Sequence, residues 1–176
     1  MPEPVWIRLG PDEVAIAELV GRRRVDSCLA AESLDGHFPH DDGYETTVRQ
    51  NQHACGGEIA VCKALGGWWE ATAGKGSANA AADIRVGRKR VQARHSIYQG
   101  GFMCIYTEDE AELPFVFVVG ELPRFRIVGW IKGTDAKVPI RWTDTNPRTG
   151  KPLRCACFVV EQVDMSFLTP LDRPEA

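Results

Sequence analysis

The most informative segment of this chain is Ala82-Asp-Ile-Arg-Val-Gly-Arg-Lys-Arg-Val-Gln-Ala-Arg-His-Ser96. Two parts of it, 82–86 and 90–96, have the pattern of strands, and they flank Gly87 and Arg88, which have the composition of a tight turn. The segment therefore predicts a β-hairpin, and the other elements are placed relative to it.

The predicted hairpin sorts its side chains by parity, because successive residues of a strand point to opposite faces of a sheet. One face of the second strand carries Gln92, Arg94 and Ser96, and the other carries Val91, Ala93 and His95. Asp83, on the first strand, can converge with Gln92 and Arg94, although the register of the pairing is left open by the sequence.

Two helices are expected before the hairpin. The first runs from about Pro11 to the low thirties, because acidic residues follow Pro11 in the turn where the helix dipole is positive. The second runs from about Val48 to Leu65 and stops at Gly66 and Gly67. Each helix has its apolar residues at helical spacing.

Glu58 is the unusual residue of the second predicted helix. It lies three residues after Cys55 and four before Cys62, so it projects from the same apolar face as these cysteines. A carboxylate that points inward is costly to bury, and this position is therefore a candidate functional site.

After the second helix the periodicity shortens to that of strands. Besides the hairpin, strands are predicted at Trp68–Thr72, Phe102–Tyr106, Phe115–Val119 and Arg126–Ile131. A loop at Thr143–Pro152 and an apolar segment, Cys155–Val163, follow. The prediction is an α/β (α+β) fold, with N-terminal helices followed by a mixed, mostly antiparallel central sheet of about five or six strands.

Length and composition favour a single domain over residues 1–176. It divides into a helical part (11–66), a sheet core (67–137) and a C-terminal loop and tail (138–176). The chain is 44% hydrophobic and 26% charged, which is typical of a globular protein. No apolar run is long enough for a bilayer, and the start of the chain lacks the pattern of a signal peptide, so a cytoplasmic location with free cysteines is expected.

The formal net charge of −3 argues against a protein that coats nucleic acid through its overall charge. Basic residues are nevertheless concentrated in and beside the predicted hairpin. They are Arg85, Arg88, Lys89, Arg90, Arg94 and His95, and the compensating acids lie at 108–112. Any contact with nucleic acid is therefore expected at a local basic patch, which Lys75 would extend.

The order of these features resembles the core of the PD-(D/E)XK nuclease superfamily. A helix carries Gly57-Glu58-Ile59, one strand carries Ala82-Asp83-Ile84, and the next strand carries Gln92-Ala93-Arg94. The likeness spans about 50–137, and it is nearest to phage and prophage proteins with an (E/Q)-x-R motif. The resemblance implies a restriction-endonuclease-like core.

The resemblance also implies an activity, namely Mg²⁺- or Mn²⁺-dependent hydrolysis of DNA by a phage-encoded enzyme in a bacterial cytoplasm. Catalytic positions would be Glu58, Asp83, Gln92 and Arg94. Asp83, Glu58, Gln92 and the carbonyl of Ala93 would hold the metal, which prefers oxygen ligands. DNA would contact Lys75, Arg85, Arg88, Lys89, Arg90 and His95, and many such nucleases act as homodimers.

Two positions depart from the family pattern. Gln92 replaces an acid and removes a negative charge from the metal site, and Arg94 replaces a lysine and cannot act as a general base. These changes favour a second hypothesis, a catalytically inactive nuclease fold that binds nucleic acid or a protein partner. A third hypothesis is a small structural protein without affinity for DNA.

Structural interpretations compete at single residues. Asp83 can cap a turn or pair with Arg85 or Lys89, and Glu58 can form an ion pair, for example with Arg94. A zinc site is a further alternative, with donors His37, His40, His53 and Cys55. The sulfurs of Cys155 and Cys157 share one side of a strand, which favours packing over a redox pair.

Overall fold

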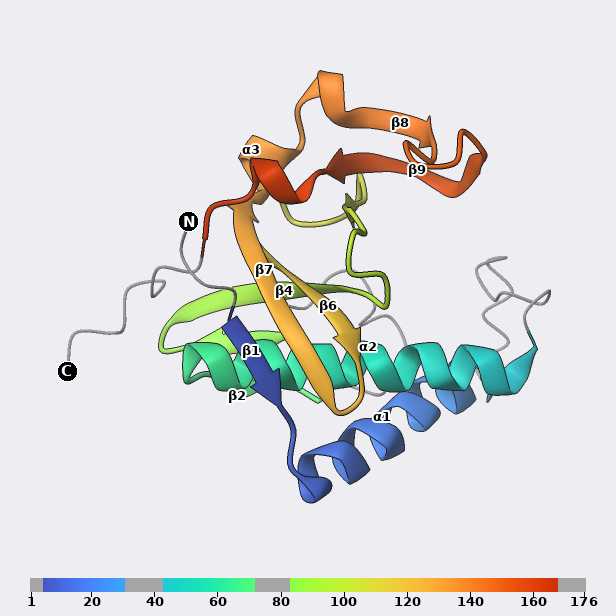
Figure 1. Ribbon diagram of the computed structural model, residues 1–176, viewed down its shortest axis with the longest axis vertical. Coiled ribbons are helices and arrows are strands. Elements are labelled where there is room, and N and C mark those ends of the chain that lie inside the picture. The colour runs from blue at the N-terminus through green and yellow to red at the C-terminus, as the bar shows by residue number, and fades with distance from the viewer. Residues whose placement is uncertain (1–4, 31–42, 72–82, 168–176) are drawn as a thin grey trace.

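A computed structural model of the chain describes residues 5–30, 43–71 and 83–167. In this part of the chain, one long helix covers one face of a six-stranded sheet, and a second long helix packs on the first. A three-stranded sheet stands over the other face (Figure 1). The predicted mixed α/β class is confirmed, and so is the size of the central sheet.

The two long helices, α1 (Pro11–Ala30) and α2 (Tyr44–Leu65), occupy the predicted places. Helix α2 begins one turn before the predicted Val48 and ends at Gly66, which has the left-handed φ of 63° that glycine adopts easily. The helices pack closely at Gly21, where a Cβ atom would lie 2.6 Å from the backbone of Gln52.

The central sheet has the strand order β1-β7-β6-β4-β3-β2. Its strands are β1 (Val5–Arg8), β2 (Trp68–Trp69), β3 (Ile84–Val86), β4 (Lys89–Ser96), β6 (Pro114–Glu121) and β7 (Arg124–Lys132). The predicted hairpin is formed by β3 and β4. Strands β4 and β6 are parallel and the other pairs are antiparallel, which agrees with a mixed, mostly antiparallel sheet.

The second sheet was not predicted. It has the order β5-β9-β8 and consists of β5 (Met103–Ile105), β8 (Trp142–Thr145) and β9 (Pro152–Val160). The run Phe102–Tyr106, expected in the central sheet, pairs instead with β9, and the predicted loop after Trp142 begins as strand β8. These pairings join distant segments, which periodicity alone does not specify.

Short helical turns lie between β7 and β8 and after β9. They are α3 (Gly133–Ala136) and the 3₁₀ turns η1 (Pro139–Arg141) and η2 (Gln162–Asp164). None of the helices in the described part of the chain is long and apolar enough to cross a membrane.

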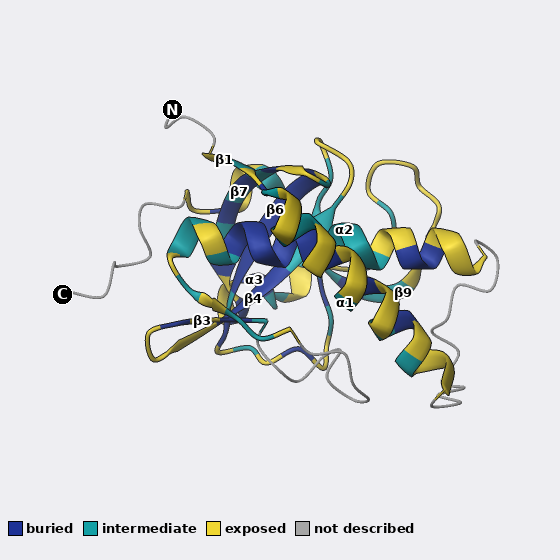
Figure 2. Ribbon diagram, turned by 90° about the horizontal axis from the view of Figure 1, so that it is seen from below, coloured by how far each residue is buried: buried dark blue, intermediate teal, exposed yellow. Residues whose placement is uncertain are grey.

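Two apolar clusters lie on opposite sides of the central sheet. The first fills the space under α2 and includes Ile59, Val91 and Val116. The second lies between the two sheets and includes Phe115 and Phe117. The middle of α2 is buried against the sheet, its first residues are exposed, and its last turn is mostly half-buried (Figure 2).

Candidate active site at the end of the hairpin

Strand β4 presents its side chains to both apolar clusters in alternation, as predicted. Gln92 pairs with Phe115 and Arg94 with Phe117, so both polar residues face the second cluster. Ala93 faces α2 as part of the first cluster. Gln92 is only 3% exposed, so this amide is buried and needs hydrogen-bond partners.

Asp83 supplies the partner of Gln92. It lies directly before β3, where the ladder with β4 ends, and its Oδ2 accepts hydrogen bonds from Gln92 Nε2 (2.7 Å) and from the backbone N–H of Ala93 (3.0 Å). Since the N–H and C=O of a strand residue point to the same side, the Ala93 carbonyl also faces Asp83. Three of the predicted site residues therefore meet.

The electrostatics of Asp83 are unusual. Burial raises the pKa of its carboxyl to about 7, and the negative charge of Glu58 acts in the same direction. The hydrogen bond from Ala93 and the charges of Arg94 and Arg24 oppose this shift without cancelling it. The half-buried Asp83 and the buried Glu58 thus lie close enough at the end of the hairpin for their charges to interact.

Glu58 reaches this site from the middle of α2, and its side chain is only 9% exposed. Its Oε1 accepts a hydrogen bond from Arg24 Nη1 (2.6 Å), while Oε2 accepts from Arg24 Nη2 (2.8 Å) and Trp69 Nε1 (2.7 Å). The ion pair that the sequence suggested is present, but the suggested partner, Arg94, is wrong. Arg24 comes from α1, and no local pattern connects it to Glu58.

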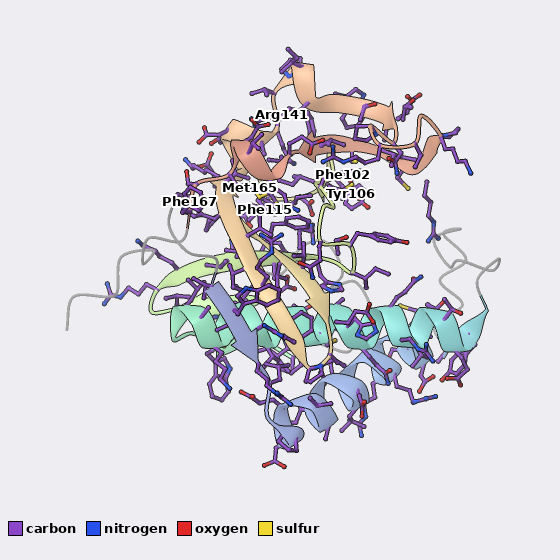
Figure 3. The ribbon with its side chains drawn as sticks, in the orientation of Figure 1. Phe102, Tyr106, Phe115, Arg141, Met165 and Phe167 are labelled. Carbon is purple, nitrogen blue, oxygen red and sulfur yellow. The ribbon has the colours of Figure 1, made fainter. Side chains whose placement is uncertain are left out.

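Arg94 is engaged on the opposite face of the sheet. Its Nη2 donates to Oδ1 of Asp109 at 2.5 Å, and its guanidinium lies 5.5 Å from the ring centre of Phe115. Figure 3 shows Phe115 and Tyr106 in the space between the two sheets. Among the described residues, Arg94 Nε is a buried nitrogen without a hydrogen-bond partner, which suits an anion acceptor.

Asp109 was missed by sequence reasoning. It is almost fully buried, and its Oδ2 accepts a hydrogen bond from the Tyr106 N–H at 2.8 Å. The ammonium group of Lys137 holds the same loop through the carbonyls of Thr107 and Asp109. The opposite charges of the acidic run 108–112 and the basic strand β4 could have predicted this contact, because the two segments lie against each other.

The basic hairpin is exposed but largely engaged with acids. Arg85 pairs with Glu70 rather than with Asp83, and Arg90 donates to both carboxylate oxygens of Glu110 at 2.6 and 2.7 Å. Arg88 is exposed at the turn, and the exposed Lys89 neighbours it. A surface of this kind can meet phosphates, provided that the acids exchange partners.

His95 lies on the other face of β4, against Gly57 of α2. Its Nε2 is 2.7 Å from the carbonyl oxygen of Gly120, and burial lowers the pKa of its ring. This position does not favour the predicted contact with nucleic acid. Lys75 lies outside the described residues.

The zinc alternative gains no support from the residues that the structure describes. His37 and His40 lie outside these residues, and His53 Nδ1 accepts the Leu122 N–H. Burial raises the pKa of Cys55 to about 12, which disfavours the thiolate that zinc requires. Cys155 and Cys157 are free thiols, and Cys157 is buried in the second sheet.

The oxygen donors at Asp83 suit a hard divalent cation better than zinc. They are the carboxylates of Asp83 and Glu58, the amide oxygen of Gln92 and the carbonyl of Ala93. Across residues 5–30, 43–71 and 83–167, however, no group of three or more His, Cys, Asp or Glu side chains is arranged to hold a metal ion. A cation here would depend on two acids, an amide and the backbone.

Fold and site together define a mixed α/β protein with two neighbouring acids, the buried Glu58 and the half-buried Asp83, at the end of a β-hairpin. Comparisons with protein-family models, curated proteins and solved structures gave no match for the chain.

Proposed function

We propose that this protein is a metal-dependent DNA nuclease of the PD-(D/E)XK type. The observation that carries the proposal is the half-buried carboxyl of Asp83, which lies beside Gln92 and Ala93. The pKa of this carboxyl is raised by burial and by the charge of Glu58. Two acids kept together away from water are stabilised by a bound cation, which favours their ionised forms.

The donor set fits Mg²⁺ or Mn²⁺, which would be held by Asp83, Gln92, Ala93 and Glu58. When bound, such an ion polarises a phosphate and lowers the pKa of a coordinated water. Gln92 donates a hydrogen bond from its amide nitrogen to Asp83, so its amide group would have to turn over to offer the oxygen to a cation beside Asp83.

Arg94 has a different part in the proposed reaction. Its guanidinium stays protonated, so it can stabilise the charge on a phosphate but cannot accept a proton from the attacking water. The buried, unpartnered Nε is a donor that a phosphate oxygen could satisfy. The exposed part of the hairpin, including Arg88, would follow the DNA backbone.

The test is cleavage of supercoiled, linear, branched and single-stranded DNA with Mg²⁺ or Mn²⁺. We expect cleavage by the purified chain and its loss in Asp83→Asn, which keeps the size of the side chain. Asp144→Asn, on the exposed strand β8, is the matched control and should retain activity. Equal cleavage by the Asp83 variant and the unmodified chain would refute the proposal.

A second function is favoured by a separate observation. Both buried cations of the site have internal partners, since Arg24 binds Glu58 and Arg94 binds Asp109. Internally paired cations are expected if the protein has a nuclease fold but no activity, and if it binds nucleic acid or a protein partner instead. This hypothesis predicts salt-dependent binding of a labelled DNA duplex, measured by fluorescence anisotropy, without cleavage in either metal.

A further inference from the structure

Both carboxylate oxygens of Glu58 are already in use. Arg24 binds them in a two-pronged ion pair with distances of 2.6 and 2.8 Å, and Trp69 Nε1 adds a third hydrogen bond at 2.7 Å. Charge-assisted, two-pronged pairs of this kind are among the stronger polar contacts in proteins. A cation that binds Glu58 directly must therefore replace at least one of these hydrogen bonds.

The fold places Arg24 at this point through the packing of the two helices. Helix α1 meets α2 at Gly21, where the backbone of Gln52 leaves no room for a side chain, and Arg24 follows one turn later. Its side chain is 20% exposed, compared with 9% for Glu58. The side chain of Arg24 is thus the more exposed member of the pair.

The charge of Arg24 acts on both acids of the site. It pairs with Glu58 directly, and its positive charge also acts on the neighbouring Asp83. The guanidinium therefore performs, in part, the electrostatic work of a bound cation.

We propose that Arg24 is a built-in competitor of the divalent cation for Glu58. The guanidinium holds the carboxylate when no cation is present, and it withdraws towards solvent when a cation binds beside Asp83. The inference rests on the proposed function, because it concerns the same cation site. It assigns to α1 a regulatory role, in which the ion pair sets the cation concentration that the site requires.

The experiment measures Mn²⁺ binding to the full chain by electron paramagnetic resonance. Arg24→Gln should bind Mn²⁺ at least about tenfold more tightly than the unmodified chain. This is the smallest gain in affinity expected when one positive charge near the cation is removed at an effective dielectric constant of about 20. Arg22→Gln is the matched control, because it removes the same charge from an exposed position of the same helix. Its affinity should be unchanged, and Asp83→Asn should lose binding.

A second variant and a second measurement guard against misfolding of Arg24→Gln. Arg24→Lys keeps the charge but loses the two-pronged geometry, so its affinity should rise less. In the unmodified chain, Mg²⁺ should shift the Trp69 indole N–H signal in a nitrogen-15 NMR titration, because that group shares Glu58 with Arg24.

The outcomes separate this inference from the proposed function. If the unmodified chain binds Mn²⁺ and the Arg24 variants bind it equally or more weakly, the competition is refuted and the nuclease proposal stands. A Trp69 signal that stays fixed while the Ala93 amide shifts refutes the competition in the same way. If the unmodified chain binds neither cation, both proposals fail.

Discussion

Arg94 and Asp109 form a buried ion pair, with Nη2 of the arginine 2.5 Å from Oδ1 of the aspartate. The two side chains are 18% and 2% exposed, so neither charge is well hydrated. Asp109→Asn would leave the guanidinium without its counter-charge. We expect the free energy of unfolding to fall by about 3 kcal/mol, measured by urea denaturation.

The control for this prediction is Glu110→Gln, which breaks the neighbouring pair with Arg90. Both of these side chains are more than 40% exposed, and exposed ion pairs contribute roughly 0 to 1 kcal/mol. A loss of equal size in the two variants would contradict the distinction between a buried and an exposed pair.

Asp83 should give the protein a characteristic dependence on pH. Its pKa is about 7 in the folded chain, against about 3.9 in an unfolded one, so between these values the folded state holds more protons. The free energy of unfolding contributed by this group therefore decreases as the pH rises from about 4 to about 7, by roughly 4 kcal/mol at most.

This decrease can be isolated by urea denaturation of the unmodified chain and Asp83→Asn over a pH series. The free energy of unfolding of the unmodified chain, minus that of the variant, should fall as the pH rises through this window. Asp144→Asn should run parallel to the unmodified chain, and a flat difference for Asp83→Asn would contradict the raised pKa.

If the protein is the proposed nuclease, Gln92→Glu should supply the acid that the PD-(D/E)XK pattern has at this position. Without metal, the new carboxylate would lie beside Asp83, where Gln92 now donates a 2.7 Å hydrogen bond, and we expect the free energy of unfolding to fall by about 2 kcal/mol. With Mg²⁺, the extra charge should raise affinity roughly tenfold. Calorimetry measures the affinity, and Gln50→Glu, on the exposed side of α2, should change neither property.

Gly21→Ala tests the contact between α1 and α2. Alanine favours a helix by up to about 1 kcal/mol over glycine, but its Cβ would lie 2.6 Å from the backbone of Gln52. We expect a net loss of about 1 to 2 kcal/mol in the free energy of unfolding. Gly100→Ala, where a Cβ atom meets nothing within 4 Å, should cost little, and an equal loss there would contradict the close packing.

Much of the local structure could be predicted because it depends on short-range patterns. The period of the apolar residues located α1 and α2, and the strand patterns around Gly87 located the hairpin. The alternation along β4 correctly placed Gln92 on the face opposite Ala93. Strand β1 and the pairing of β5 with β9 were missed, because both depend on partners far away in the chain.

Local sequence indicated that Asp83 and Gln92 could meet at the end of the hairpin, but it also placed Arg94 with them, and this side chain pairs with Asp109 instead. Strand parity and helical spacing fix the directions of Asp83, Gln92 and Glu58 within their own elements. Their ionic partners emerged from long-range packing alone, since Arg24 reaches Glu58 where the helices cross and Asp109 reaches Arg94 through the fold of a loop. Such pairings follow from the relative positions of whole elements, and no local pattern encodes them.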